Sequence, residues 1–304
     1  MGSFIIKRVA AGVATIVVVT LTVFVMLRFS GDPASLLLPP DATIEQIESL
    51  RESLGLNRPL LVQYWQFIVR AVHGDLGISF RYKQPTLGLV FSHLPSTLVL
   101  AGAAILLAGS VGVPLGLIAA VRRGSWVDRL AQGLAAIGQS APVFWTGMML
   151  ILLLAVHFQL FPVSGRYSAS SIVLPSVTLA IFNLGLLMRV VRSEILDVLG
   201  MDFVRTAHAK GLTAPSVMLR HVLRNASIGI ITVIGLQFGA LLGGAVVTET
   251  VFAWPGLGRL TVDAIYIRDF PLVVAAVSVI AVMITALNIL VDVTYALLDP
   301  RIRY

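Results

Sequence analysis

Long apolar blocks separated by polar segments dominate the chain. Six of them reach the length of about 20 residues that a helix needs to cross the hydrocarbon core of a bilayer. They lie at residues 9–29, 95–121, 131–157, 172–191, 228–249 and 272–296. This pattern predicts an all-α polytopic membrane protein in which residues 1–304 form a single domain with six transmembrane helices.

The first block follows Lys7 and Arg8, as the apolar part of a signal peptide would. Its apolar run is too long for a signal peptide, and no cleavage site of small residues follows it. We therefore expect this block to remain in the protein as its first helix.

The composition supports the membrane class and excludes others. The chain is 57% hydrophobic and only 12% charged, whereas soluble domains carry about twice that charged fraction. It has no cysteine, which excludes disulfides, thiolate metal sites and cysteine nucleophiles. The net charge of +7 comes from basic residues that flank apolar blocks, so lipid and not nucleic acid is the expected partner.

The distribution of lysine and arginine predicts the orientation. If the N-terminus is cytoplasmic, the inner segments hold 13 of the 22 basic residues. Six of the other nine lie in or beside one long external segment, where the positive-inside rule has little force. We therefore expect both termini to be cytoplasmic.

The long external segment, residues 30–94, has its own helix signals. Thr43 and Gln46 form a capping-box pattern, and Pro59 begins a second apolar-periodic stretch that ends at Gly74. The segment is therefore predicted to be a helical extracytoplasmic insert. It either packs on the bundle or contacts the substrate, and the sequence leaves both open.

Glycines spaced four apart predict close helix contacts within the membrane. Gly112 and Gly116 form such a pair in the second block, and the fifth block carries a stripe of three. The stripe consists of Gly235, Gly239 and Gly243. A packed helix that lines a pore is one interpretation of the fifth block, and tight packing without a pore is the other.

Polar residues within the spans are the candidates for a translocation path. The sequence at 138–142 breaks the helix in the third block, which is tolerated only against protein or a water-filled path. The candidates are Gln139, Ser140, Asn183, Gln237 and Glu249. Asp292, near the end of the last block, is expected to form a structural ion pair with Arg301 or Arg303.

The chain lacks the motifs of an enzyme. It contains no Gly-Lys-Ser/Thr to bind ATP phosphates and no His-Glu-x-x-His, and its five histidines lack metal-site spacing. Ser140 in the sequence Gly-Gln-Ser-Ala is reminiscent of intramembrane serine proteases, but only His157 lies near a span end in that region. We expect no catalytic residue, no metal and no cofactor in this chain.

One polar segment between apolar blocks, residues 202–226, has an ordered pattern. A short helix is expected to end at Gly211, and Pro215 lies in the first turn of the next helix. Ala207 and Gly211 lie four residues apart, which would allow close approach to a partner. A basic loop that only sets orientation would not need these small residues, so we interpret the segment as a docking element.

The same segment reads Arg-Thr-Ala-x-Ala-Lys-Gly-x9-His-x-x-Arg-Asn-Ala and resembles the cytoplasmic "EAA" loop of bacterial ABC importer permeases. It looks like the form found in the dipeptide/oligopeptide/nickel branch, and most like the first permease subunit of dipeptide or glutathione importers. Arg205 stands where the motif has an acid, and the closing proline is absent. Other stretches that resemble the family are Gly31-Asp32-Pro33, Leu54–Leu60, Gly74–Ser79, Leu94–Thr97, Leu174–Ser176, Gly235–Phe238, Phe252–Gly258 and Asp299–Tyr304.

This resemblance implies a type I importer permease in the bacterial inner membrane. Such a permease pairs with a second permease, two ATPases carry ATP and Mg, and an external binding protein delivers substrate. Residues 192–227 would form the cytoplasmic coupling loop. The residues expected to contact the ATPase are Arg205, Thr206, Ala207, Lys210, Gly211, His221, Arg224 and Asn225.

The substrate stays open at this point. Small peptides are the first expectation, and glutathione and nickel chelates are alternatives within the same architecture. A transporter driven by an ion gradient belongs to a different class and would favour paired ionisable groups near the middle of the membrane. A membrane protein without a transport role is a third possibility.

Overall fold

The structure is a computed structural model that describes residues 2–29, 34, 35, 38, 41–53 and 55–298. Within these residues the regular structure is helical, and the only strand-like pairing is an isolated bridge between Ile78 and Pro85. The helices of the first half are α1 (Gly2–Phe29), α3 (Ile44–Ser53), α4 (Leu60–Val72), α5 (Thr86–Val121), α6 (Trp126–Ser140), α7 (Val143–Leu150) and the π-helix η1 (Ile151–His157). The helices of the second half are η2 (Ala169–Ile172), α8 (Val173–Leu199), α9 (Asp202–Ala209), α10 (Ala214–Ser216), the π-helix η3 (Val217–Val222), α11 (Leu223–Gly244), α12 (Val246–Val251), α13 (Leu257–Tyr266) and α14 (Phe270–Leu298).

Five helical stretches of the described chain are long and apolar enough to cross a membrane. They are Ile6–Leu27, Thr86–Val121, Ala169–Leu199, Ala214–Gly244 and Phe270–Thr294. A sixth crossing is possible only if the bent pair Trp126–Ser140 and Val143–His157 counts as one span. The prediction of an all-α protein with several transmembrane helices is confirmed.

The block at 131–157 is not one straight helix. Its two halves meet at 98°, and the break falls at Ala141, which is extended with φ −77° and ψ 130°. Pro142 causes this, because its ring disfavours the helical conformation of the preceding residue. The helix-breaking sequence at 138–142 thus gives a sharp turn between α6 and α7.

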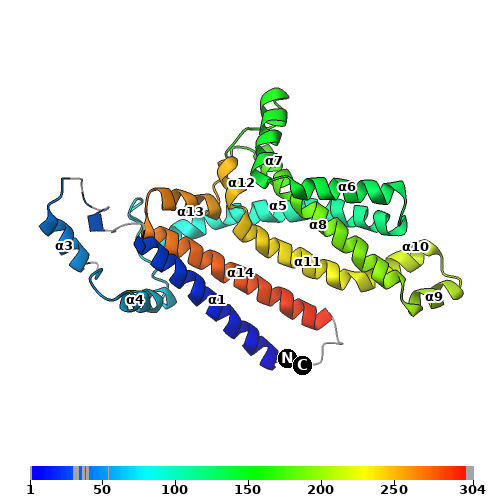
Figure 1. The fold of residues 1–304 in the computed structure, drawn as a ribbon, viewed down its shortest axis with the longest axis horizontal. Coiled ribbons are helices and arrows are strands. Elements are labelled where there is room, and N and C mark those ends of the chain that lie inside the picture. The colour runs from blue at the N-terminus through cyan, green and yellow to red at the C-terminus, as the bar shows by residue number, and fades with distance from the viewer. Residues whose placement is uncertain (1, 30–33, 36–37, 39–40, 54, 299–304) are drawn as a thin grey trace.

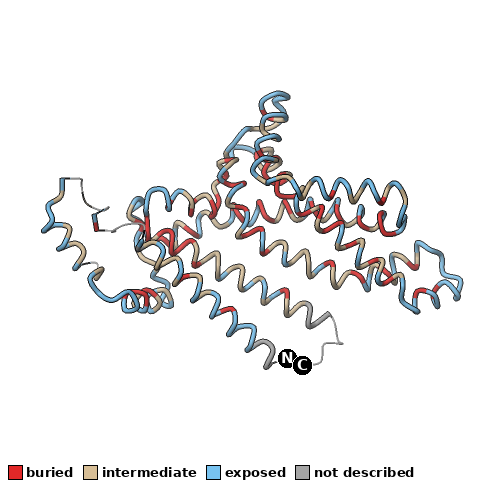
Figure 2. Tube along the Cα trace, viewed as in Figure 1, coloured by how far each residue is buried: buried red, intermediate tan, exposed pale blue. Residues whose placement is uncertain are grey.

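The helices α5, α8, α11 and α14 form the centre of the molecule (Figure 1). α6 packs on α8, and α1 packs on the outer side of α14. α3 and α4 lie at one end of the long axis, here called the insert end, and α9 and α10 lie at the opposite end, here called the loop end. Buried residues concentrate in the central helices, whereas much of α1 is exposed (Figure 2).

The glycine pairs predicted from their spacing lie at helix contacts. A Cβ added to Gly116 of α5 would lie 2.6 Å from the carbonyl oxygen of Met188 in α8. The stripe of α11 faces α14, where Gly235 lies against Val291 and Gly243 against Ile284. This stripe therefore serves tight packing between α11 and α14.

Asp292 forms an ion pair, as expected of a structural role, and its partner among the described residues is Arg8. Its Oδ2 lies 3.2 Å from Nε of Arg8, which joins α14 to α1. The expected partners Arg301 and Arg303 lie outside the described residues.

Candidate functional site

The segment 202–226 folds as two short helices around a glycine turn. The N–H of Gly211 donates to the carbonyl of His208 at 2.9 Å, and the N–H of Leu212 donates to the carbonyl of Ala207 at 3.3 Å. This pair of bonds is a Schellman motif, which requires a left-handed residue after the helix. Gly211 supplies it with φ +80°, so a residue with a side chain would be strained there.

The inner face of this segment is apolar and buried. Val204 and Ala207 of α9 and Val217 and Val222 of η3 belong to one core cluster. Residues of α8, including Ile195, complete the same cluster. The two short helices are thus held rigidly on the end of α8 and are not a loose loop.

Ala207 and Gly211 do not share one exposed face. Ala207 is only 7% exposed and points into the core cluster. Gly211 is exposed, and a Cβ added to it would meet nothing within 4 Å. Ala207 therefore permits close packing within the chain, and Gly211 serves the turn.

The other expected coupling residues lie mostly on the outer side. Arg205, Thr206, Lys210, Arg224 and Asn225 are exposed. Arg205 lies 3.8 Å from Asp202 in an ion pair whose side chains are 81% and 96% exposed. Asn225 donates to the carbonyl of His221 at 2.7 Å, and the His221 side chain is half-buried.

The outer side also exposes large apolar side chains, which the sequence reasoning missed. Met201, Phe203, Leu212 and Leu219 are 37–62% exposed. They lie within residues 201–219, two before and two after Gly211 in the sequence, and we call these four residues the apolar patch. The signal in the sequence is Phe203, a large apolar residue at the edge of the face of α9 that buries Val204 and Ala207.

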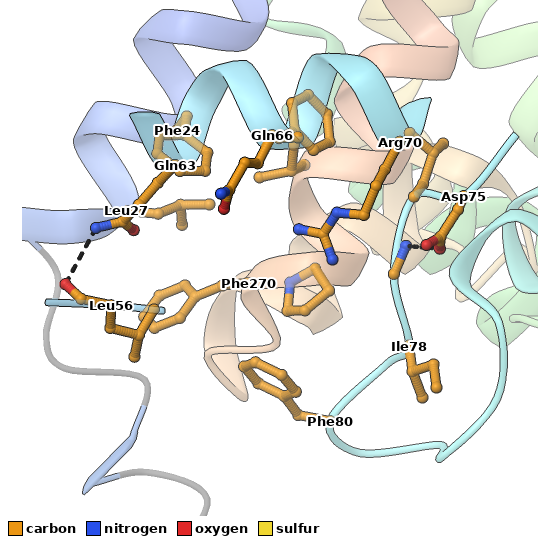
Figure 3. A pocket seen from close by; sticks show the side chains of 15 residues that line it. Phe24, Leu27, Leu56, Gln63, Gln66, Arg70, Asp75, Ile78, Phe80 and Phe270 are labelled. Carbon is orange, nitrogen blue, oxygen red and sulfur yellow. Dashed lines mark hydrogen bonds between the residues drawn. The ribbon is translucent and has the colours of Figure 1, made fainter. Parts of the chain in front are cut away.

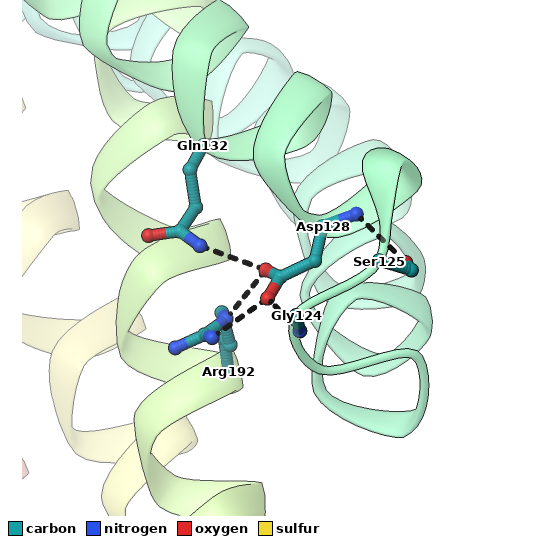
Figure 4. Close-up of polar contacts among 5 residues, drawn as sticks. All are labelled: Gly124, Ser125, Asp128, Gln132 and Arg192. Carbon is teal, nitrogen blue, oxygen red and sulfur yellow. Dashed lines mark hydrogen bonds and ion pairs between the residues drawn. The ribbon is translucent and has the colours of Figure 1, made fainter.

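An ion pair clamps α6 to α8 just before the loop end (Figure 4). Arg192 of α8 holds both carboxylate oxygens of Asp128, through Nε at 2.7 Å and Nη2 at 2.8 Å. Asp128 is 2% exposed and also accepts from the Gly124 N–H and the Gln132 side chain. Such a bidentate pair fixes both distance and orientation, so α6 and the end of α8 move together.

Three of the five candidate path residues lie on α6 and α8. Ser140 is exposed, and its hydroxyl bonds to the backbone carbonyls of its own helix. Asn183 is buried and donates to the carbonyl of Leu179 at 2.7 Å. Gln139 accepts a hydrogen bond from Arg189, while its Nε2 is buried without a partner among the described residues.

Gln237 of α11 resembles Gln139 in one respect. Its Nε2 is also buried and has no hydrogen-bond partner in the part of the chain that the structure describes. An unpaired buried donor is costly, so these two amides are the path candidates whose donors most need a further partner.

Glu249 occupies a different environment from the other path candidates. It is fully buried at 0% exposure, and its carboxylate accepts from the Thr97 hydroxyl at 2.6 Å and from the Arg259 N–H at 3.0 Å. Thr97 in turn accepts from the Leu257 N–H at 2.8 Å. The carboxylate thus sits at the N-terminus of α13, where a negative charge is favourable.

The turn Phe252–Arg259 folds around this carboxylate. Gly256 lies directly against the Glu249 carboxylate and leaves no room for a Cβ. Trp254 is 1% exposed and donates from its indole to the carbonyl of Ser96 at 2.9 Å. We call Glu249, Thr97 and this turn the Glu249 anchor.

A second buried carboxylate, absent from the candidates, fixes the insert. Asp269 is 1% exposed and accepts from the Ser79 hydroxyl at 2.5 Å and the Arg81 N–H at 3.0 Å. It also accepts from the Leu272 N–H at 3.3 Å and so caps α14. The loop after α4 is thereby tied to the turn between α13 and α14.

No group of three or more metal-ligating residues occurs among the described positions.

Two protein families match adjacent parts of the chain and together cover nearly all of it. Residues 1–101 match the N-terminal part of a binding-protein-dependent transport system membrane component. Residues 112–304 match the binding-protein-dependent transport system inner membrane component.

Relatives of known function match along the full length. The dipeptide transport system permease protein DppB of Escherichia coli (strain K12) is 40% identical, and the match covers 100% of this chain and 99% of the relative. The glutathione transport system permease protein GsiC of the same strain is 41% identical, with 100% of both chains covered.

Solved structures share the fold. A chain of the inward-facing MetNI methionine ABC transporter superposes with a TM-score of 0.60 at 17% identity, over 70% of this chain and 97% of that one. A chain of an amino acid ABC transporter superposes with a TM-score of 0.52 at 19% identity, over 68% and 92%. The chain belongs to the family of binding-protein-dependent transport system inner membrane components, the multi-pass permeases of ABC importers.

Proposed function

We propose that the chain is one of two permease subunits of an ATP-driven importer of small peptides. An external binding protein delivers the substrate, and two ATPase subunits dock at the loop end. In this arrangement the loop end and both termini are cytoplasmic and the insert end is extracytoplasmic. The relatives that transport dipeptides and glutathione support this substrate class.

The observation that carries the proposal is the surface of the segment 202–226 together with the preceding Met201. It presents the apolar patch beside the basic side chains of Arg205, Lys210, Arg220 and Arg224 on a rigidly packed base. An apolar patch on an ordered protrusion favours a protein partner. The chain has no phosphate-binding motif of its own, so in an ATP-driven importer the ATP sites would belong to partner subunits.

The connections of this segment suit the transmission of force. The second short helix continues without a break into α11, because Ala214–Gly244 is one helical stretch of 31 residues. The first short helix follows α8, which the Asp128–Arg192 pair clamps to α6. Movement of the apolar patch would therefore be transmitted directly to α11. It would also be transmitted to α8, and α6 would move with α8 as one unit.

For the path itself we propose Gln139, Ser140, Asn183 and Gln237. All four lie on α6, α8 or α11, the helices that continue into the loop end or are clamped to it. For Glu249 we propose a positioning role, because it is buried and its carboxylate is hydrogen-bonded to the backbone at the start of α13.

Docking is tested by introducing negative charges into the apolar patch. The double variant Phe203→Glu/Leu219→Glu, expressed with the other subunits, is expected to insert in the membrane but to lose co-purification of the ATPases and substrate uptake. Ile44→Glu on α3, where the side chain is 85% exposed at the insert end, is the matched control. Normal co-purification and uptake by the double variant would contradict the docking proposal.

The substrate is tested separately, with the cognate binding protein added to the complex. Reconstituted complexes are expected to take up dipeptides in competition assays. If only glutathione or a nickel chelate is transported, the architecture stands and the peptide assignment is wrong. Uptake that follows an ion gradient and needs no ATP would overturn the importer class.

A further inference from the structure

Helix α4 of the insert has an unusual distribution of side chains. Its outward residues are apolar: Leu61 is 74% exposed, Trp65 66%, Val69 42% and Val72 80%. At 3.6 residues per turn these four side chains fall within about 80° of one another, so they form one stripe. We call them the α4 stripe.

The polar residues of α4 lie on the opposite side of the helix. Gln63, Gln66 and Arg70 line a cavity of about 430 Å³ that is bounded by α1, the start of α14 and the loop after α4. Figure 3 shows the Gln66 and Arg70 side chains directed into this cavity, together with Phe270 of α14. A surface helix in water turns its polar side outward, whereas α4 exposes an apolar stripe and, of these three polar residues, exposes only Arg70.

A third side of α4 packs on a transmembrane helix. The Tyr64 hydroxyl donates to the Val17 carbonyl at 2.9 Å and lies 2.8 Å from the hydroxyl of Thr20, both in α1. Thr20 precedes Leu27, where the apolar span ends, by seven residues, which is about 10 Å along a helix at 1.5 Å per residue. The Tyr64 hydroxyl thus contacts α1 inside its apolar span and not at the end of that span.

The membrane span on which α4 packs also exposes apolar residues. α1 is a membrane span, and its own outward residues are apolar, such as Val18 at 61% and Met26 at 66% exposure. With 13 residues α4 is too short to cross the bilayer. An apolar helix with an exposed Trp is typical of the boundary between hydrocarbon and headgroups.

We propose that α4 is an interfacial helix whose stripe of Leu61, Trp65, Val69 and Val72 is embedded in the bilayer leaflet at the insert end. Its partner is the acyl region of that leaflet. The helix thereby holds the insert, including the loop tied to Asp269, at a fixed height on the membrane. The inference needs α1 to be a membrane span and does not depend on the substrate.

The neighbouring helix α3 provides the contrast within the same insert. Its sequence IEQIESLRES carries three glutamates and has no buried residue. Ile44 of α3 is 85% exposed and makes an apolar control of similar size to the residues of the stripe.

The absence of cysteine from the chain allows a direct test. Single variants Leu61→Cys, Val69→Cys and Ile44→Cys are spin-labelled in the complete complex in liposomes, with the cysteine-free chain in the same complex as background. Collision with oxygen, which concentrates in lipid, is compared with collision with a water-soluble nickel chelate. Both stripe positions are expected to collide more with oxygen, and Ile44→Cys more with the nickel chelate.

Two results would overturn the proposal. Greater collision with the nickel chelate at Leu61→Cys and Val69→Cys would show that the stripe faces water. Low collision with both agents and a restricted label would show that protein covers it. Repeating that measurement without the binding protein would then tell whether the binding protein or the second permease is the cover.

Discussion

The Glu249 anchor and the segment 202–226 are both polar interruptions between apolar helices, and they differ in where their polar groups are directed. In the anchor, the Glu249 carboxylate accepts from Thr97 and from the N-terminus of α13 and is inaccessible to solvent. In the segment 202–226, only the inner apolar face is buried, and the basic side chains remain outside. The carboxylate of the anchor has its hydrogen bonds within the chain, whereas the basic side chains of the segment 202–226 are available to a partner.

This difference predicts different responses to mutation. A change in the anchor should act on the stability of the fold, because buried donors lose their acceptor. A change on the outer side of the segment 202–226 should act on assembly and leave the fold intact. The following predictions separate the two kinds of response.

The largest effect is expected from Glu249→Ala. Thr97 and the α13 N-terminus would lose their acceptor, and each buried donor left unpaired costs about 1–3 kcal/mol. We expect a clear fall in the melting temperature of the purified complex and a low yield. Asp263→Ala is the control, because Asp263 is 52% exposed and meets Arg259 only at 3.6 Å. Equal melting temperatures for the two variants would refute the anchor.

The second effect concerns the clamp between α6 and α8. Asp128→Ala leaves Arg192 without its bidentate partner, and breaking a buried pair costs about 3–5 kcal/mol. We expect about 2–3 kcal/mol because the Arg192 side chain, 21% exposed, retains some contact with water. The measurement is a double-mutant cycle with Arg192→Ala, in which the double variant should lose less than the sum of the single variants. Strict additivity would show that the pair does not act as a unit.

The clamp and the anchor also mark the limit of prediction from sequence. The apolar blocks, the break near Pro142 and the glycine turn at Gly211 follow from local rules, and the structure shows each of them. Glu249 and Thr97 are 152 residues apart, and Arg192 and Asp128 are 64 apart. No local rule joins residues at such separations, so these pairs could not be found from the sequence.

The direction of a side chain on a short helix was equally hard to predict. Ala207 and Gly211 have helical spacing, but the helix ends at Ala209 and the chain turns at Gly211. The buried side of α9 is the side that packs against α8 in the core cluster, and this contact is not visible in the sequence of α9. The orientation of the termini and the roles of the individual coupling and path residues stay predictions.

Ala207→Leu gives the third effect and separates packing from docking. Ala207 is 7% exposed in the core cluster, and overpacking such a site costs about 1–3 kcal/mol. We expect a lower melting temperature even for the permease without its ATPases. The matched control is Ala209→Leu on the same helix, which is exposed and should leave the melting temperature unchanged. A loss of ATPase binding with unchanged stability in Ala207→Leu would instead place this residue on the docking surface.

The smallest effect on stability is expected from Arg205→Ala. Its pair with Asp202 is long and almost fully exposed, and exposed pairs contribute little because water and salt screen them. We therefore expect no measurable change in melting temperature. ATPase binding at low ionic strength should weaken, because the cation lies beside the apolar patch and can attract an acidic partner.

The salt dependence of that binding decides what Arg205 does. If its charge guides docking, the difference between Arg205→Ala and the native chain should shrink as salt is raised. Arg205→Lys keeps the charge and should bind like the native chain at every salt concentration. If Arg205→Lys fails as Arg205→Ala does, the guanidinium makes a geometric contact that an ammonium cannot reproduce. The segment 202–226 would then resemble the Glu249 anchor, with a polar group fixed by defined donors and acceptors, but with the acceptors supplied by the partner subunit.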